Sequence, residues 1–423
     1  MNIMMIHHRL PYPLHSGMDK VRYNLICSLM TQHQVTLIVP VIGDNSADDI
    51  CQVEKICTKL IVVPISESRV KFRKSRMFMY WRWWRLVVLR RPMYTTTDYF
   101  SEVSQAIKKT FRDNTFDVVQ VMSNVAGRYI EVIPEGAKVI LGPMDDSIEA
   151  ARTNGRVATG FKARAVWKLR QRARKYYDAR ICRIADWTFF HSPDDLHSFS
   201  DATGGGFSAS VLPTAVETGE PDGFDLEHSI LCEKPGSIVF VGGLGSAFNI
   251  DAVLYFHREI YTLVKSRFSG THFHIVGQNP PRDIVALGQE DDVSVTGSVA
   301  SVRPYIENAA VYIAPVRSGT GFKTKIVEAL SLGKAIVSLP GGVQGLWDLG
   351  EGAMRVVSDA QSFADETVNI LEDYELRRRL KKSARKLYED VYSFDAVTPL
   401  VLEEYDRVAG HEIIMRRSKE MGQ

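Results

Sequence analysis

Two lysines and a glutamate follow a glycine-bearing loop in the second half of the chain. Residues 311–340 read VYIAPVRSGTGFKTKIVEALSLGKAIVSLP and contain Gly319, Gly321, Lys323, Lys325 and Glu328. Glycines let a ligand approach the backbone, and free N–H groups at a helix start bind phosphate, here helped by two cations. A carboxylate one turn into the helix can accept hydrogen bonds from two neighbouring hydroxyls. Phosphate and diol together indicate a nucleotide.

The elements that position these residues follow from the apolar pattern. Residues 311–314 form a β-branched run before Pro315, which predicts a buried strand. From Thr324 the apolar residues fall at helical spacing until Gly333, and residues 335–339 form a second apolar run. The loop then lies at the C-terminal end of a parallel strand, where open α/β sheets bind ligands. An ordinary βαβ unit with turn glycines and solvated lysines fits the same spacing, because a glycine-rich loop alone is weak evidence.

The stretch resembles the donor-binding segment of the family-4, group 1 retaining glycosyltransferases of the GT-B fold. Glu328, Ala329, Gly333 and Lys334 match their usual pattern, while Thr320 stands in place of its first glutamate. The closer match is a subgroup that reads Gly-x-Gly-Thr-Arg-Leu-Lys-Ile-Leu-Glu-Ala. Similar family phrases occur at residues 239–251 and 293–305.

The resemblance implies a set of site residues. Departure of a nucleoside diphosphate builds negative charge that a metal or fixed cations must stabilise, and Lys323 and Lys325 are the candidates. Residues 11–17 resemble the Pro-x-Pro, Ser-Gly-Gly loop that approaches the donor pyrophosphate, with Met18 in place of the second glycine. The donor-binding residues that the resemblance implies are Gly17, Gly243, Gly297, Val299, Gly321, Thr324 and Glu328.

Alternating strand and helix patterns predict an α/β protein with two Rossmann-like domains that face an interdomain cleft. The expected bounds are 1–212 for an acceptor-facing domain, 213–236 for a linker and 237–395 for a donor-binding domain. Residues 396–423 are expected to form a final helix and a tail, and the resemblance implies that this helix crosses back to the first domain. Residues 186–191 are expected to be the last strand of the first domain. The basic run at 377–382 in a later helix reads as a solvated face.

Composition is that of a water-soluble globular protein, with 45% apolar and 24% charged residues. No apolar run is long enough to span a bilayer, and the N-terminus lacks the pattern of a signal peptide, so a cytoplasmic protein is expected. Five scattered cysteines suggest reduced thiols, neither a disulfide framework nor a zinc site. No cofactor and no metal are expected.

Charge divides unevenly along the chain. Residues 1–212 hold 30 lysines and arginines against 20 acidic residues, whereas the remainder holds 22 against 30. Residues 69–94 combine nine cations with seven aromatic residues and no acidic residue. This composition favours an interfacial segment on anionic lipid. Single-stranded nucleic acid and a helix with merely solvated cations are the alternatives.

The acceptor-facing or membrane-facing candidates are His7, His8, Arg82, Trp83, Trp84 and Arg85. The resemblance implies a metal-independent retaining hexosyltransferase, and the basic, aromatic segment predicts a peripheral position at the inner face of the plasma membrane. It would move a sugar from a nucleotide donor, with a uridine diphosphate sugar expected, to a lipid-linked or saccharide acceptor in bacterial surface polysaccharide biosynthesis. A nucleotide-sugar epimerase of the same fold and a noncatalytic membrane-binding or nucleic-acid-binding protein are the alternatives. Nucleic acid is not an expected partner, because no nucleic-acid motif occurs elsewhere.

Overall fold

A computed structural model describes residues 1–14, 17–42, 47–68, 75–158, 160–216, 225–317 and 321–410. The N-terminal half builds one parallel sheet with the strand order β3-β2-β1-β4-β5-β6-β7. Its strands are β1 (Asn2–Ile6), β2 (Gln34–Ile42), β3 (Lys59–Ile65), β4 (Val118–Val121), β5 (Lys138–Met144), β6 (Trp187–Phe190) and β7 (Ala209–Val211). Its helices are α1 (Gly17–Met30), α2 (Ala47–Glu54), α4 (Arg76–Val88), α5 (Tyr94–Thr97), α6 (Ser101–Asp113), η1 (Gly127–Val132), α7 (Ser147–Val157), α8 (Phe161–Ile184) and α9 (Pro193–Thr203).

The C-terminal half builds a second parallel sheet with the order β10-β9-β8-β11-β12-β13. Its strands are β8 (Lys234–Val241), β9 (His272–Val276), β10 (Val293–Val295), β11 (Ala309–Ala314), β12 (Ile336–Ser338) and β13 (Arg355–Val356). The helices are α10 (Leu226–Leu231), α11 (Ala247–Tyr255), the π-helical η2 (Phe256–Tyr261), α12 (Thr262–Arg267), α13 (Arg282–Leu287), α14 (Arg303–Asn308), α15 (Thr324–Ser331), α16 (Pro340–Val343), α17 (Ala360–Glu372), α18 (Tyr374–Leu387), the π-helical η3 (Tyr388–Tyr392) and α19 (Phe394–Ala409).

Continuous apolar runs explain the central strands of both sheets. All six residues of β11 and all four of β4 are buried, as expected for parallel strands that carry helices on both faces. β1 lies between β2 and β4, so that Met4 pairs with Thr36 on one side and Val119 on the other. The carboxyl ends of β1, β4, β5 and β6 consequently meet at one edge of the first sheet.

The prediction that residues 186–191 form the last strand of the first domain is wrong. β6 pairs with β7, a strand of three residues that forms the sheet edge. The sequence signal for β7 is weak, because Ala209, Ser210 and Val211 are only partly buried and too few to show a period.

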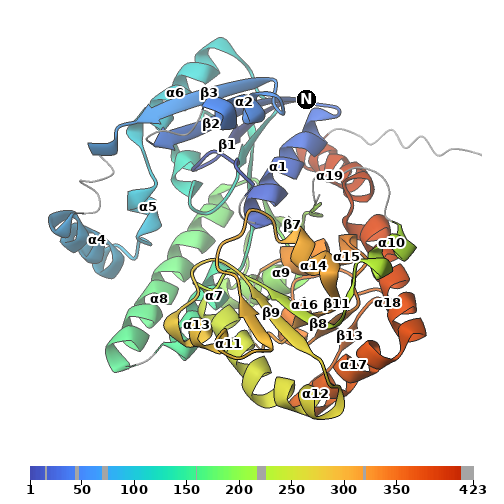
Figure 1. The fold of residues 1–423 in the computed structure, drawn as a ribbon. Coiled ribbons are helices and arrows are strands. Elements are labelled where there is room, and N and C mark those ends of the chain that lie inside the picture. The colour runs from blue at the N-terminus through green and yellow to red at the C-terminus, as the bar shows by residue number, and fades with distance from the viewer. Residues whose placement is uncertain are drawn as a thin grey trace, which may run out of the picture.

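The final helix joins the two halves. α19 packs along α1, and both lie together in Figure 1. The hydroxyls of Ser28 and Thr398 are 2.8 Å apart, and the ring of Tyr405 lies 5.6 Å from that of Phe189 in β6. Two of the four buried hydrophobic clusters contain residues from both halves. The halves therefore share a packed interface beside the carboxyl ends of the strands.

Helices α4 and α8 lie at the far side of the N-terminal sheet from α1, at the left of Figure 1. α8 is a helix of 24 residues with nine lysines and arginines and one acidic residue, Asp178. α4 packs on α8. Among the described residues, no helix combines the length and hydropathy that a membrane span requires.

Candidate functional site

The predicted loop connects β11 to α15 at the carboxyl edge of the second sheet. Gly319 and Thr320, on which part of the prediction rests, lie outside the described residues. The chain resumes at Gly321, whose φ of +78° is the left-handed conformation that glycine adopts without strain. Lys323 precedes the first residue of α15, Thr324, and Glu328 follows one turn later. The loop thus delivers two lysines and a carboxylate to one helix start.

The start of α1 meets the start of α15 at this point. Gly17 is the first residue of α1, and a Cβ atom there would lie 1.9 Å from Thr324 Oγ1. Glycine is required because any side chain would overlap the threonine. The N-termini of two helices, each the positive end of a helix dipole, therefore converge from the two domains.

Glu328 links the two domains through paired cations. Its Oε1 lies 2.8 Å from Lys20 Nζ of α1, and its Oε2 lies 2.7 Å from Lys325 Nζ. Burial alone would raise the pKa of Glu328, but Lys325 and Lys20 outweigh burial and hold that pKa below its ordinary value. The buried carboxylate is therefore ionised. Sequence analysis missed Lys20, although its place three residues after Gly17 puts it in the first turn of α1.

Lys323 lies between a backbone carbonyl and three aspartates of the N-terminal domain. Its Nζ donates to Gly321 O at 3.0 Å. Burial lowers the pKa of Lys323, and the negative charges of Asp195, Asp145 and Asp194 oppose that shift. Asp194, in the first turn of α9, also accepts a hydrogen bond from the backbone N–H of Gly345 at 3.3 Å. The N-terminal domain thus faces the loop with carboxyl groups.

Asp145 directly follows β5 and faces Gly321. A Cβ atom at Gly321 would lie 2.9 Å from Asp145 Oδ1, and that oxygen is buried without a hydrogen-bond partner among the described residues. Burial raises the pKa of Asp145, although Arg22 and Lys323 act in the opposite direction. Sequence analysis missed this residue. The sequence feature that could have identified Asp145 is its position as the first charged residue after β5, a strand whose carboxyl end lies at the same sheet edge as that of β1.

The two predicted histidines follow β1. His7 is fully buried, and its Nδ1 contacts the carbonyl of Arg9, so it does not face a membrane, while its role toward the acceptor stays a prediction. Its burial follows from its place directly after the central strand. His8 is partly buried, with its Nδ1 3.3 Å from Ser123 Oγ. Burial and the charge of Arg22 lower the pKa of His8 to about 3.

A third histidine, His191, follows β6 at the same edge. Its Nδ1 lies 3.3 Å from Thr214 Oγ1, and burial lowers its pKa to about 4 despite the neighbouring Asp195. His8 and His191 are therefore neutral at pH 7. In each ring, one nitrogen can donate a hydrogen bond and the other can accept one.

The other predicted donor residues lie around the carboxyl edge of the second sheet. Gly243 is exposed after β8, and its carbonyl accepts from Asn249 Nδ2 at 2.9 Å. Gly297 follows β10 with a φ of +69°. Val299 packs against the cluster that contains Phe322 and Ile326 of the loop and α15. These three residues lie at the same carboxyl edge of the sheet as the loop.

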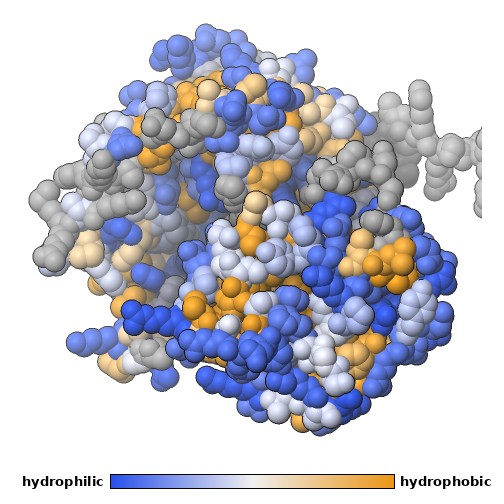
Figure 2. All heavy atoms as spheres, viewed as in Figure 1, coloured by the Kyte–Doolittle hydropathy of each residue, from blue (hydrophilic) through white to orange (hydrophobic). Residues whose placement is uncertain are grey.

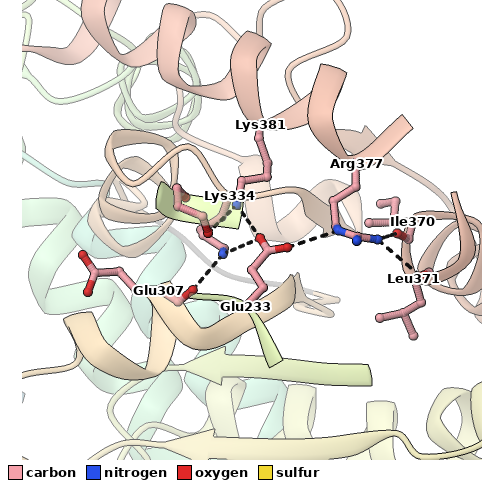
Figure 3. A network of polar contacts seen from close by, with 8 residues as sticks. Glu233, Glu307, Lys334, Ile370, Leu371, Arg377 and Lys381 are labelled. Carbon is pink, nitrogen blue, oxygen red and sulfur yellow. Dashed lines mark hydrogen bonds and ion pairs between the residues drawn. The ribbon is translucent and has the colours of Figure 1, made fainter. Parts of the chain in front are cut away.

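Lys334, which matches the Gly-Lys of the resembling pattern, is a structural residue. Figure 3 shows Lys334, Lys381 and Arg377 converging on the carboxylate of Glu233. Glu233 Oε1 lies 2.9 Å from Lys334 Nζ and contacts Lys381 Nζ, while Oε2 lies 3.1 Å from Arg377 Nε. The prediction of a solvated face is thus wrong for Arg377 and Lys381, because a carboxylate 144 and 148 residues away covers them.

The predicted membrane-facing residues lie on α4, remote from α15 in Figure 1. Trp84 is 52% exposed, Arg82 and Trp83 are partly buried, and Arg85 is buried with its guanidinium over the ring of Trp81. Arg85 is therefore not membrane-facing, and burial together with the charges of Arg128 and Arg91 lowers its pKa to about 10. In Figure 2, hydrophilic and hydrophobic residues are intermixed where α4 lies.

Comparison with known proteins agrees with this architecture. Residues 235–373 match the model of the family described as glycosyl transferases group 1. The chain is 30% identical over 127 residues to a phosphatidyl-myo-inositol mannosyltransferase of Mycolicibacterium smegmatis. The aligned segment covers 29% of this chain and 31% of that protein. The chain thus spans about a third of the length of the curated relative that it matches.

Two solved structures cover nearly the whole chain. Sucrose-phosphate synthase of Thermosynechococcus elongatus superposes with a TM-score of 0.68 at 15% identity, over 97% of this chain and 99% of the other. HepE of Anabaena, solved with UDP-glucose, superposes with a TM-score of 0.61 at 11% identity, over 96% and 100%. The predicted fold is confirmed: the chain has two Rossmann-like domains in the GT-B arrangement.

Proposed function

We propose that this chain is a glycosyltransferase that binds a nucleotide-sugar donor where α1 and α15 converge. The observation that carries the proposal is the contact between Gly17 and Thr324, with Lys20, Lys325 and Glu328 beside it. The family match over residues 235–373 supports the same activity.

Each group at the convergence has a role in this proposal. The two helix N-termini and Lys323, Lys325 and Lys20 stabilise the diphosphate as it departs and gains charge. Glu328 accepts hydrogen bonds from the ribose hydroxyls, which requires the lysine contacts to its carboxylate to open or to be shared. Lys20, released from one oxygen of Glu328, then turns to the phosphates. Donor binding would thereby bring a residue of each domain onto the same ligand.

The donor proposed is a uridine diphosphate sugar, supported by the fold shared with HepE, which was solved with UDP-glucose. The acceptor proposed is a lipid-linked or saccharide molecule of a bacterial surface polysaccharide, and the sugar is transferred as a hexose with retention. Support for a lipid acceptor comes from the name of the curated relative, a mannosyltransferase of phosphatidyl-myo-inositol. The exposed aromatic residues of α4 support a peripheral position on an anionic membrane.

The deciding experiment measures binding and hydrolysis of a panel of nucleotide sugars by the wild-type chain and by Lys325→Ala and Glu328→Ala. We expect one donor to bind, with at least tenfold weaker binding in both variants, because each loses a charged hydrogen-bonding group. Lys386→Ala is the matched control, since Lys386 is 74% exposed and pairs with Asp390 on the outer face of the same domain. Equal binding by all four proteins would refute this donor site.

The same panel separates transfer from epimerisation. An epimerase converts the donor sugar in the absence of any acceptor, whereas a transferase only hydrolyses it slowly. Once an acceptor is found, the anomeric coupling in the NMR spectrum of the product reports retention or inversion. Acceptor-free appearance of a second nucleotide sugar would replace the transferase proposal by the epimerase.

A further inference from the structure

A cavity in the N-terminal domain, remote from the convergence of α1 and α15, is lined by three arginines. It has a volume of about 160 Å³ and lies between α4, the start of α5 and α8. The lining residues are Arg82, Leu86, Pro92, Met93, Tyr94, Arg170 and Arg174. This volume is roughly half the ~300 Å³ at which pockets for larger ligands begin, but it exceeds the ~30 Å³ of a water molecule about fivefold. A compact headgroup fits, and a nucleotide sugar does not.

The arginines of this cavity form no salt bridge with any described residue. Burial lowers the pKa of Arg170, and the nearby charges of Arg174 and Arg82 lower it further. Arg174 Nη1 donates to the carbonyl of Ser147 at 2.8 Å, and Arg82 Nε is buried without a partner among the described residues. The cluster therefore repels itself and retains unused donors.

The nearest carboxylate is already engaged. Asp178 accepts hydrogen bonds from Tyr94 at 2.6 Å, from Asn124 at 3.1 Å and from Ser147. One turn from Arg82, Arg85 is only 8% exposed, and its Nε and Nη2 have no partner among the described residues. Buried guanidinium groups without an acceptor are costly to the fold. Their presence together indicates that an anion from outside completes the cluster.

Guanidinium groups in this number indicate a phosphate. Arginine presents a planar fork of donors that matches phosphate oxygens in pairs, and it stays charged when buried. Arg170 is also held in place by stacking on Trp167, with its guanidinium carbon 4.7 Å from the ring centroid. The donors are thus partly preorganised for one tetrahedral anion.

The surface next to the cavity indicates that the phosphate belongs to a lipid. On α4, Tyr80, Val87 and Val88 are 72%, 54% and 56% exposed. Nucleic-acid bases stack on aromatic rings and gain little from exposed valines, whereas acyl chains pack against both. On the other side of α8, a further cavity is lined by the cations Arg90, Arg172, Lys175, Arg180 and Arg183.

We propose that the arginine cavity binds the phosphate of an anionic lipid headgroup while the outer face of α4 enters the bilayer interface. The proposal deepens the peripheral membrane position given under Proposed function and is independent of the donor site. It names a defined phosphate pocket in place of a diffuse attraction between basic residues and an anionic surface.

The test is co-sedimentation of the full chain with vesicles of phosphatidylcholine that contain phosphatidic acid or, at equal surface charge, phosphatidylserine. Phosphatidic acid exposes its phosphate, whereas the phosphate of phosphatidylserine is covered by serine. Arg170→Gln removes a cavity arginine, and Arg172→Gln removes an exposed charge two residues away on α8 that does not line the cavity. We expect wild type to prefer phosphatidic acid.

The two variants should differ. Arg170→Gln should weaken binding to phosphatidic acid vesicles about tenfold or more, the effect of losing a charged hydrogen-bonding group. Arg172→Gln should weaken binding to both vesicle types by about fivefold, the effect of one basic residue near a charged surface. Equal losses in both variants on both vesicle types would overturn the pocket. Unchanged binding of a nucleotide sugar by Arg170→Gln shows that the variant is folded.

Soluble competitors separate the remaining sources of the anion. Inorganic phosphate or glycerol phosphate is added to the vesicle mixture as a competitor. If a low concentration displaces the chain, and the chain binds lipid phosphate no better than soluble phosphate, the pocket is a site for free phosphate and the lipid proposal is refuted. Arg170-dependent binding of a single-stranded oligonucleotide would overturn it in favour of nucleic acid. Donor binding without any vesicle binding removes this proposal alone, and vesicle binding without any donor removes only the proposed function.

Discussion

The C-terminal domain surrounds one carboxylate with three cations, whereas the N-terminal domain gathers arginines that form no ion pair with a described carboxylate. At Glu233 the side chains of Lys334 and Lys381 are completely buried, and each cation has an ion-pair partner (Figure 3). At the arginine cavity, Arg82, Arg170 and Arg174 have no salt bridge within the described part of the chain. The first arrangement is complete without a ligand, and the second lacks an anion.

Burial of a cation does not by itself indicate a function. What separates the two regions is whether the fold supplies the counter-charge. The convergence of α1 and α15 lies between these cases, because Glu328 pairs with Lys20 and Lys325 but draws them from two domains. A contact between domains can be exchanged for a ligand at less cost than one inside a domain.

The largest expected effect is on the paired cluster. Glu233→Gln leaves Lys334, Lys381 and Arg377 without a carboxylate, and it should lower the free energy of unfolding by about 3–5 kcal/mol. Glu227→Gln, which breaks an exposed pair with Arg378, should cost under ~1 kcal/mol. Urea denaturation of both variants tests the contrast. A similar small loss in both would show that the buried cluster contributes no more than an exposed pair.

His191 is a buried ionisable group that the fold keeps neutral. The dependence of the free energy of unfolding on pH tests this arrangement. The pKa of His191 is about 4 in the folded chain against 6.5 for an ordinary histidine. Between these values the unfolded chain binds more protons, so the stability present above pH 6.5 should be lost as pH falls toward 4. Burial of the neutral ring causes this loss, and the Asp195 carboxylate opposes it in part.

Melting temperatures across this pH range provide the measurement. His191→Asn should flatten the decline, and His197→Gln, at an exposed histidine of α9, should leave it unchanged. A decline of the same steepness in His191→Asn would assign the acid sensitivity to other groups.

Glu328→Gln tests the intermediate case. The neutral amide keeps the shape of the side chain but loses the charge that holds Lys20 and Lys325, so donor affinity should fall by roughly 1.5–3 kcal/mol. Stability should change less than in Glu233→Gln, because Lys20 and Lys325 remain partly exposed. Isothermal titration with the donor, beside urea denaturation, measures both quantities. Intact donor affinity would exclude the carboxylate from the site.

The smallest expected effect is a change in the free energy of unfolding whose direction should differ between two arginine variants. Arg85→Met should leave the free energy of unfolding unchanged or raise it by about 1 kcal/mol, because it removes a buried guanidinium whose unpaired donors cost more than the stacking on Trp81 returns. Arg377→Met should lower it, because that guanidinium pairs with Glu233. Thermal melts of the two variants should therefore move in opposite directions. Destabilisation of Arg85→Met comparable to that of Arg377→Met would remove the distinction between the clusters.

Part of this molecule could be predicted from local patterns. The buried run of β11 and the helical spacing in α15 identify the strand and helix that carry Lys323 and Glu328, because both periods are visible within a few residues. β7 could not be identified in this way, since three partly buried residues show no period. Burial of Lys381 was also hidden, because the sequence around it is a run of cations typical of an exposed helix face.

Local sequence patterns specify most of the strands and helices, with β7 as an exception, and the loop that presents lysines at a helix start. Only the tertiary structure decided which charges face one another. Lys20 and Glu328 are separated by 308 residues, and Asp145 meets Gly321 from the other domain. The reason is physical: secondary structure follows from neighbours along the chain, whereas the pairing of a charge depends on which distant segments the packed core brings within a few ångströms.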